Sequence, residues 1–287
     1  MFHGEFPPDT LTTLAIATDL PLGVFDSGVG GLTVLRALRH RLPNESTIYL
    51  GDTARVPYGT KTRESVVRYA TQATEHLVAR GIKLLVVACN TATALSLPEL
   101  QTRFAPLPVV GVIEPGAEAA VAASRTQRHL VLATESTVKQ HAYALAIRAL
   151  APAAKVEEIP CSLFVALAEE GWTEGAIPDA VAERYLKVSM SQPADKLPDT
   201  IVLGCTHFPL LKRAIRSAIG HGPTIVDSAT TTAEYVAGML ARGKLLRTSG
   251  TPTMRLVATD GGRRFADVGS RFLDQRVNAS DVELVDL

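Results

Sequence analysis

Short aliphatic runs alternate with longer amphipathic segments along most of the chain, and this alternation constrains the fold more than any other feature. It is typical of βα units whose strands form parallel sheets. The strands are continuously apolar, which indicates that helices bury both faces. We therefore predict an α/β fold with doubly wound, mainly parallel sheets. Strands are expected at 22–26, 46–52, 83–89, 108–114, 129–134, 155–161, 200–205 and 224–227, and helices at 31–42, 63–81 and 176–190.

Three pairs of strand ends recur at nearly constant spacing and in the same order. The spacing is 116 residues between Cys89 and Cys205, 108 between Asp26 and Thr134, and 113 between Glu114 and Asp227. The length of 287 residues also exceeds what a single domain usually takes. We therefore predict two similar α/β domains related by a pseudo-twofold axis.

The two domains are expected to divide the chain unequally. Residues 21–116 together with 228–287 are predicted to form the first domain, and residues 117–227 the second. Residues 1–20 are interpreted as a loosely ordered extension before the first strand. Each domain then carries one cysteine at the carboxyl edge of its sheet, and the cleft between the domains is the expected active site.

Two cysteines stand where an apolar strand ends, in ACNTATA (88–94) and LGCTHFPLL (203–211). A buried cysteine can serve simply as a small hydrophobic residue. The same layout occurring twice favours a function, because open α/β sheets bind ligands beyond the carboxyl ends of their strands. The following helical turn offers free N–H groups and a positive dipole end, which suit a carboxylate ligand and a thiolate.

Other motifs have simpler structural explanations. The glycine-rich turn at 26–34 lacks the Gly-Lys-Ser/Thr of a phosphate-binding loop, and Thr33 replaces the third glycine of the dinucleotide pattern. His207 is a conceivable zinc ligand with Cys205, but no Cys-x-x-Cys or second histidine cluster accompanies it. We interpret Cys161 as structural. Glu169, taken alone, reads as a solvated helix end.

Composition excludes several classes of partner. The chain has 29 acidic and 29 basic residues, so no net charge attracts nucleic acid or an anionic membrane. No apolar stretch approaches the roughly 18 residues of a membrane span, and the N-terminus lacks the features of a signal peptide. Three widely spaced cysteines do not form a disulfide framework, which favours a reducing cytoplasm.

Four stretches together resemble the glutamate racemases of the aspartate/glutamate racemase family: FDSGVGGLTV, YLGDTARVPYG, ACNTATA and LGCTHFPLL. The resemblance implies two facing α/β domains and a racemase that needs no cofactor, neither pyridoxal phosphate nor a metal. It implies interconversion of L- and D-glutamate, with D-glutamate supplied for peptidoglycan in the bacterial cytoplasm. A homodimer is expected.

The resemblance also implies roles for individual residues. Cys89 and Cys205 match the two acid/base groups, Asp26 the acidic residue beside the first thiol, His207 the histidine beside the second, and Glu169 a glutamate near that histidine. Substrate contacts map to Asp26 and Ser27, Tyr58 and Gly59, Asn90 and Thr91, and Thr206 and His207.

Inversion of a stereocentre explains the duplication, because it needs a base on one face of the substrate and an acid on the other. One cysteine must be a thiolate while its opposite is a thiol. Three rival interpretations remain open at this point: an aspartate or hydantoin racemase, a carboxylate-binding regulator without catalysis, and a dithiol redox enzyme. The last requires sulfur atoms about 2 Å apart, whereas a racemase needs room for a substrate carbon between them.

Overall fold

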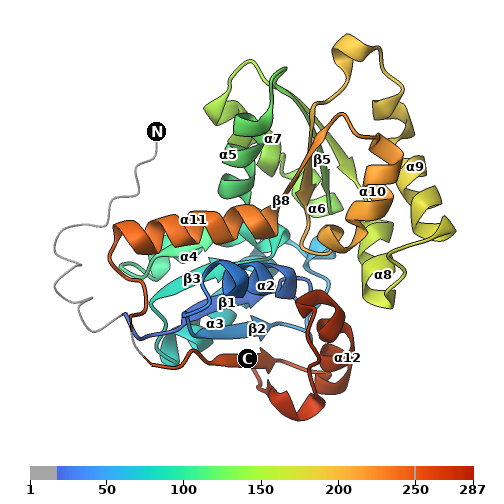
Figure 1. Ribbon diagram of the computed structural model, residues 1–287. Coiled ribbons are helices and arrows are strands. Elements are labelled where there is room, and N and C mark those ends of the chain that lie inside the picture. Colours follow the sequence, from blue (N-terminus) through green and yellow to red (C-terminus); the bar gives the residue numbers. More distant parts are fainter. Residues whose placement is uncertain (1–17, 249) are drawn as a thin grey trace.

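The computed structural model describes residues 18–248 and 250–287, which form two parallel sheets covered by helices (Figure 1). The predicted extension at 1–20 falls mostly outside the described residues, and 18–20 form a turn that leads into the first strand. The α/β fold with two parallel sheets is confirmed. Among the described residues, no helix is long and apolar enough to cross a membrane.

The first sheet has six strands in the order β10-β9-β2-β1-β3-β4, and every neighbouring pair is parallel. The second sheet has four strands in the order β6-β5-β7-β8, again all parallel. Their bounds are β1 Leu22–Asp26, β2 Thr47–Gly51, β3 Leu84–Val87, β4 Val109–Gly111, β5 Arg128–Ala133, β6 Lys155–Pro160, β7 Thr200–Gly204, β8 Thr224–Asp227, β9 Met254–Ala258 and β10 Val282–Leu284.

The central four strands of the first sheet follow the order β2-β1-β3-β4, and the second sheet repeats it as β6-β5-β7-β8. The strand that leads to Cys89 therefore holds the same place in its sheet as the strand that leads to Cys205. This agreement supports the internal duplication inferred from the spacing of the strand ends. Strands β9 and β10, which were given no predicted bounds, extend the first sheet alone.

Helices cover both faces of each sheet, as continuously apolar strands require. In the first sheet, α2, α11 and α12 pack on one face and α3 and α4 on the other. In the second, α8, α9 and α10 pack opposite α5 and α7. The bounds are α2 Leu32–Arg41, α3 Arg63–Ala79, α4 Asn90–Arg103, α5 Ile113–Ala123, α6 Glu135–Lys139, α7 Ala142–Leu150, α8 Ser162–Glu170, α9 Ala176–Met190, α10 Lys212–Ile219, α11 Ser228–Arg242 and α12 Gly262–Leu273.

One predicted strand is shorter than expected. The run at 108–114 was predicted to be extended throughout, but β4 ends at Gly111 and α5 begins at Ile113. Pro115 is compatible with this start, because proline is tolerated in the first helical turn. Glu114 therefore lies inside a helix, whereas Asp227 ends a strand and caps α11. The proposed repeat of these two residues is wrong, although their strands do correspond.

The proposed domain boundary at 116/117 falls within α5. Ile113 and Ala117 of this helix pack with Val131 of the second sheet, whereas α11 packs against α2 of the first. These two helices are thus where the chain passes between the sheets (Figure 1). The division into 21–116 with 228–287, and 117–227, remains our proposal.

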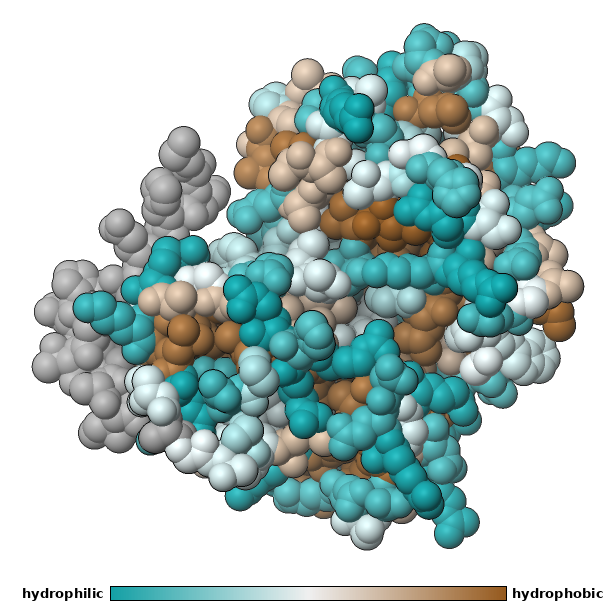
Figure 2. Space-filling view, in the orientation of Figure 1, coloured by the Kyte–Doolittle hydropathy of each residue, from teal (hydrophilic) through white to brown (hydrophobic). Residues whose placement is uncertain are grey.

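Most large hydrophobic side chains lie in the cores between sheets and helices, and a minority, such as Trp172 and Val188, are exposed. The surface view shows them as separate patches between hydrophilic residues (Figure 2). The segments that follow β1, β3 and β7 meet where the two sheets adjoin. The candidate site lies there.

Candidate active site

Cys89 begins the first half of the site. It follows β3 as the N-cap of α4, and its Sγ accepts a hydrogen bond from the Ala92 N–H at 3.4 Å. The Ser27 hydroxyl lies 3.4 Å from the same sulfur. Burial, followed by the charge of Asp26, raises the pKa of Cys89 to about 12. The sulfur therefore holds its proton at neutral pH and is placed to act as an acid.

Asp26 ends β1 beside this thiol and is only 1% exposed. Its Oδ2 accepts a hydrogen bond from the Gly28 N–H at 2.9 Å. Its Oδ1 is buried and has no hydrogen-bond partner among the described residues. Burial raises the pKa of Asp26 despite the opposing charge of His207. A carboxyl group so placed can exchange a proton with a neighbouring group.

Cys205 begins the second half, directly after β7. The Nδ1 of His207 lies 3.7 Å from its Sγ, and the Nε2 of the same ring lies 3.2 Å from Glu169 Oε1. Burial lowers the pKa of His207, but the hydrogen bonds to Cys205 and Glu169 outweigh burial and raise it to about 10. The hydrogen bond to His207 in turn lowers the pKa of Glu169. The His207 ring thus lies between the Cys205 sulfur and the Glu169 carboxylate.

The two halves touch through the glycine-rich turn after β1. A Cβ on Gly30 would lie 2.3 Å from Thr206 Oγ1 and 2.4 Å from Cε1 of His207, so no larger residue fits there unaltered. The Thr33 hydroxyl donates to the Thr206 carbonyl oxygen at 2.9 Å. The charge of Cys205 contributes to the raised pKa of Cys89. Gly30 therefore allows the close approach of the two halves.

The remaining predicted substrate contacts surround this junction. The Tyr58 hydroxyl donates to Asp52 Oδ2 at 2.5 Å, which fixes the turn carrying Gly59. The Thr91 hydroxyl lies 3.0 Å from that of Thr134, and Thr206 is buried beside Gly30. The structure thus places the first-half residues after β1, β2 and β3, and the second-half residues after β7.

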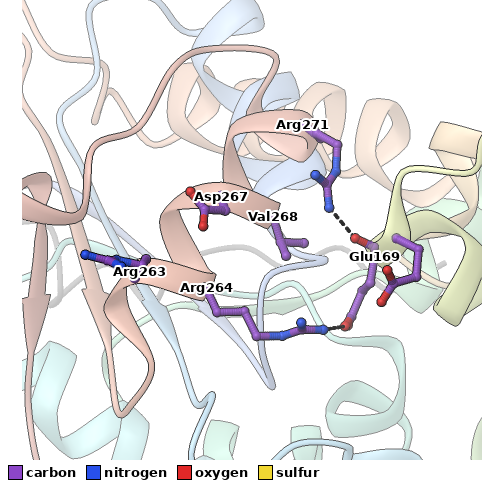
Figure 3. A pocket seen from close by; sticks show the side chains of 7 residues that line it. Glu169, Arg263, Arg264, Asp267, Val268 and Arg271 are labelled. Atoms are coloured by element: carbon purple, nitrogen blue, oxygen red, sulfur yellow. Dashed lines mark hydrogen bonds and ion pairs between the residues drawn. The ribbon is translucent and has the colours of Figure 1, made fainter.

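Glu169 is held by a helix of the other sheet. Arg264 Nη2 lies 3.1 Å from Glu169 Oε2, and Arg271 donates to the Glu169 carbonyl oxygen (Figure 3). Both arginines belong to α12, whereas Glu169 lies on α8. The groove between these helices, of about 460 Å³, is lined by Glu169, Glu170, Arg263, Arg264, Asp267, Val268 and Arg271. The position of Glu169, which pairs with His207, therefore depends on contact between the two halves.

Among the described side chains, no three of His, Cys, Asp or Glu gather as a metal-binding group, and all three cysteines are free thiols. The site offers two thiols, each with its own ionisable neighbour, on opposite sides of a junction. Such a pair can remove a proton from one face of a carbon and return one to the other.

Comparison with known proteins identifies the family of this chain. The family model of Asp/Glu/hydantoin racemases matches residues 32–236. A glutamate racemase of Geobacter metallireducens is 51% identical over 253 residues, covering 88% of this chain and 92% of that protein. The chain belongs to the Asp/Glu/hydantoin racemase family. It is an amino-acid racemase, so the non-catalytic regulator and the dithiol redox enzyme are set aside.

Solved structures of this racemase family share the whole fold. Glutamate racemase from Bacillus anthracis superposes with a TM-score of 0.88 at 34% identity, covering 94% of this chain and 98% of that one. The enzyme from Francisella tularensis, solved in complex with D-glutamate, gives a TM-score of 0.85 at 35% identity and covers 93% of this chain and 98% of that one. The two-domain architecture is therefore common to this chain and these racemases.

Sequence reasoning missed several residues that contact the candidate site. Thr134 and Thr137 form a hydroxyl cluster with Thr91, with oxygens 3.0 and 3.4 Å from the Thr91 hydroxyl. The internal repeat could have pointed to Thr134, because Thr134 occupies the position in the second half that Asp26 occupies in the first. Asp52 lies in the motif YLGDTARVPYG but was given no role. Tyr143 contacts Asn90, and no motif pointed to it.

Proposed function

We propose that this racemase interconverts L- and D-glutamate by a two-base mechanism in which Cys89 and Cys205 act on opposite faces of the α-carbon. The glutamate racemases that resemble it along nearly the whole chain support this substrate. The observation that carries the mechanism is the matched position of the two thiols. Each follows the equivalent strand of its sheet, and each has a different ionisable neighbour.

The two neighbours favour one starting protonation state. Imidazolium at His207 stabilises a thiolate on Cys205, while burial and the charge of Asp26 keep Cys89 a thiol. In this state Cys205 removes the α-proton of L-glutamate and Cys89 delivers its own proton to the opposite face. The product is D-glutamate, with Cys89 now the thiolate and Cys205 the thiol. The reverse reaction begins from that second state.

The developing carbanion needs electrostatic help in a site that excludes water. We propose that the substrate carboxylates accept hydrogen bonds from the first turns after the cysteine strands, including Asn90, Thr91 and Thr206. Ser27 and the turn of Tyr58 and Gly59 complete the enclosure. No pyridoxal phosphate or metal takes part in the proposed mechanism. A cytoplasmic homodimer that supplies D-glutamate for peptidoglycan belongs to the same proposal and rests on the resemblance.

Isotope exchange tests the substrate and the reaction. In deuterium oxide, the enzyme is expected to convert L-glutamate to D-glutamate with deuterium at the α-carbon, as seen by chiral analysis and mass spectrometry. L-Aspartate serves as the comparison substrate. Faster exchange with aspartate than with glutamate would reject the glutamate assignment in favour of the aspartate racemase alternative.

Single serine variants test the two-base mechanism. Cys89→Ser and Cys205→Ser are each expected to lower racemisation by about 100- to 10,000-fold, because a hydroxyl is a far weaker acid than a thiol. Cys161→Ser is the matched control and should retain activity. Analogues that lose a leaving group after proton abstraction separate the roles. Cys89→Ser should still eliminate from the L-isomer, and Cys205→Ser from the D-isomer.

A further inference from the structure

A buried tyrosine of the second half reaches across to the first. Tyr143 lies on α7 and is fully buried, and its hydroxyl donates to Asn90 Oδ1 at 2.7 Å. Asn90 is the first residue of α4 and directly follows Cys89. The hydroxyl therefore acts on a residue of the site from an element that carries no catalytic group.

The tyrosine ring is held in place by two glycines. A Cβ on Gly204 would lie 2.8 Å from Tyr143 Cε2, and one on Gly116 would lie 3.0 Å from Tyr143 Cε1. Both glycines thus leave the space that the ring edges occupy. Gly204 ends β7 immediately before Cys205. Tyr143 consequently contacts the residue before one cysteine and the residue after the other.

The amide nitrogen of Asn90 is left without an acceptor. Asn90 is 3% exposed, and its Nδ2 is buried with no hydrogen-bond partner in the part of the chain that the structure describes. A buried donor without an acceptor carries a desolvation cost, so such a group points to a ligand. Because the tyrosine hydroxyl donates to Oδ1, the Nδ2 of the same planar amide is turned away from Tyr143.

We propose that Tyr143 is a positioning residue that holds the Asn90 amide with its NH₂ group, rather than its carbonyl oxygen, toward a carboxylate of the substrate. The inference rests on the proposed function, since it takes a carboxylate-bearing substrate as the acceptor. With the amide reversed, a carbonyl oxygen would face the carboxylate and repel it. The same ring ties this orientation to the strand that carries Cys205, so both halves must be assembled for the donor to be presented.

The first test removes the hydroxyl oxygen of Tyr143. Tyr143→Phe keeps the ring between Gly116 and Gly204 and frees the Asn90 amide to rotate. Loss of one hydrogen bond of ordinary strength predicts a KM for glutamate about 3- to 10-fold higher in both directions, with kcat within about 3-fold. Tyr185→Phe is the matched control, since it also loses a hydroxyl that makes a hydrogen bond, here from the Leu163 N–H at 3.1 Å. It should leave KM unchanged.

A double-mutant cycle shows whether the tyrosine acts through Asn90. In an Asn90→Ala background, Tyr143→Phe should change KM by less than about 2-fold, because residues that act as a unit are not additive. Equal effects of Tyr143→Phe with and without Asn90 would overturn the inference and indicate a general packing role. Wild-type KM in both directions is measured first. Failure of the wild type to racemise glutamate rejects the proposed function rather than the role of Tyr143.

The wild-type protein provides a second measurement that requires no variant to fold. In protein labelled with ¹⁵N, the side-chain NH₂ signal of Asn90 should shift saturably when D-glutamate is added. Its protons should show no strong cross-relaxation to the Tyr143 ring. An NH₂ signal that is insensitive to glutamate, or that lies against the ring, contradicts the proposed orientation.

Discussion

Replacing Gly30 with alanine tests whether the two halves of the site must touch for catalysis. The added Cβ would lie 2.3 Å from Thr206 Oγ1 and 2.4 Å from the His207 ring, whereas ordinary contact begins at 3.4 Å. The two segments must therefore separate by about 1 Å. A misplacement of that size costs on the order of 100-fold in rate when it moves a catalytic group.

The contacts around His207 indicate that the clash is not easily relieved. The Thr206 hydroxyl can rotate away, but the imidazole is held by Glu169 on one side and packs edge-on against Phe272, with ring centroids 5.1 Å apart. Overpacking of this kind typically costs about 1–3 kcal/mol of stability. Gly30 does not have a positive φ, so alanine meets no backbone strain of its own.

The assay is steady-state racemisation, with thermal unfolding measured in parallel. Gly30→Ala is expected to lower kcat/KM by about 100-fold or more while the protein remains folded. Gly28→Ala is the matched control in the same turn, because the nearest atom to its Cβ is Val56 Cγ2 at 3.4 Å, and about 3-fold or less is expected. A Gly30→Ala enzyme with wild-type kcat/KM would refute the view that this approach places His207.

Three further outcomes are expected. The pKa of His207 is raised from 6.5 to about 10, so its contribution to stability is full below pH 6.5 and is lost as the pH rises through 10. Between pH 6.5 and 10, the unfolding free energy of His207→Gln should therefore fall less than that of the wild type. Arg264→Gln should lower kcat/KM only about two- to fivefold, since the arginine is two-thirds exposed. The control Arg263→Gln should leave kcat/KM unchanged. Equal effects of the two variants would exclude a role of Arg264 through Glu169. Lys83→Met leaves the buried Glu45 without the ammonium group that lies 2.5 Å from its carboxylate. The free energy of unfolding, measured with urea, should fall by about 3–5 kcal/mol while kcat is retained. A smaller loss would show that water reaches the ion pair.

Much of the fold and of the chemistry follows from local sequence. Strands of parallel sheets are continuously apolar, so their runs and their polar ends are visible without any knowledge of packing. That is why the strand ends at Asp26, Cys89 and Cys205 were predicted to lie at the carboxyl edges of two sheets that face one cleft. Where the local signal is ambiguous the prediction fails, as at 108–114, since apolar residues continue from a short strand into a helix.

Tertiary structure alone decided which distant side chains meet where the two sheets adjoin. Tyr143 and Arg264 read in the sequence as one more aromatic and one more surface charge, and nothing near them marks a site. Their roles arise because α7 packs beside the strand before Cys205 and α12 lies against α8. Such contacts depend on how helices and sheets from distant parts of the chain pack against one another. That packing is set by the shapes of both surfaces, which no single stretch of sequence encodes.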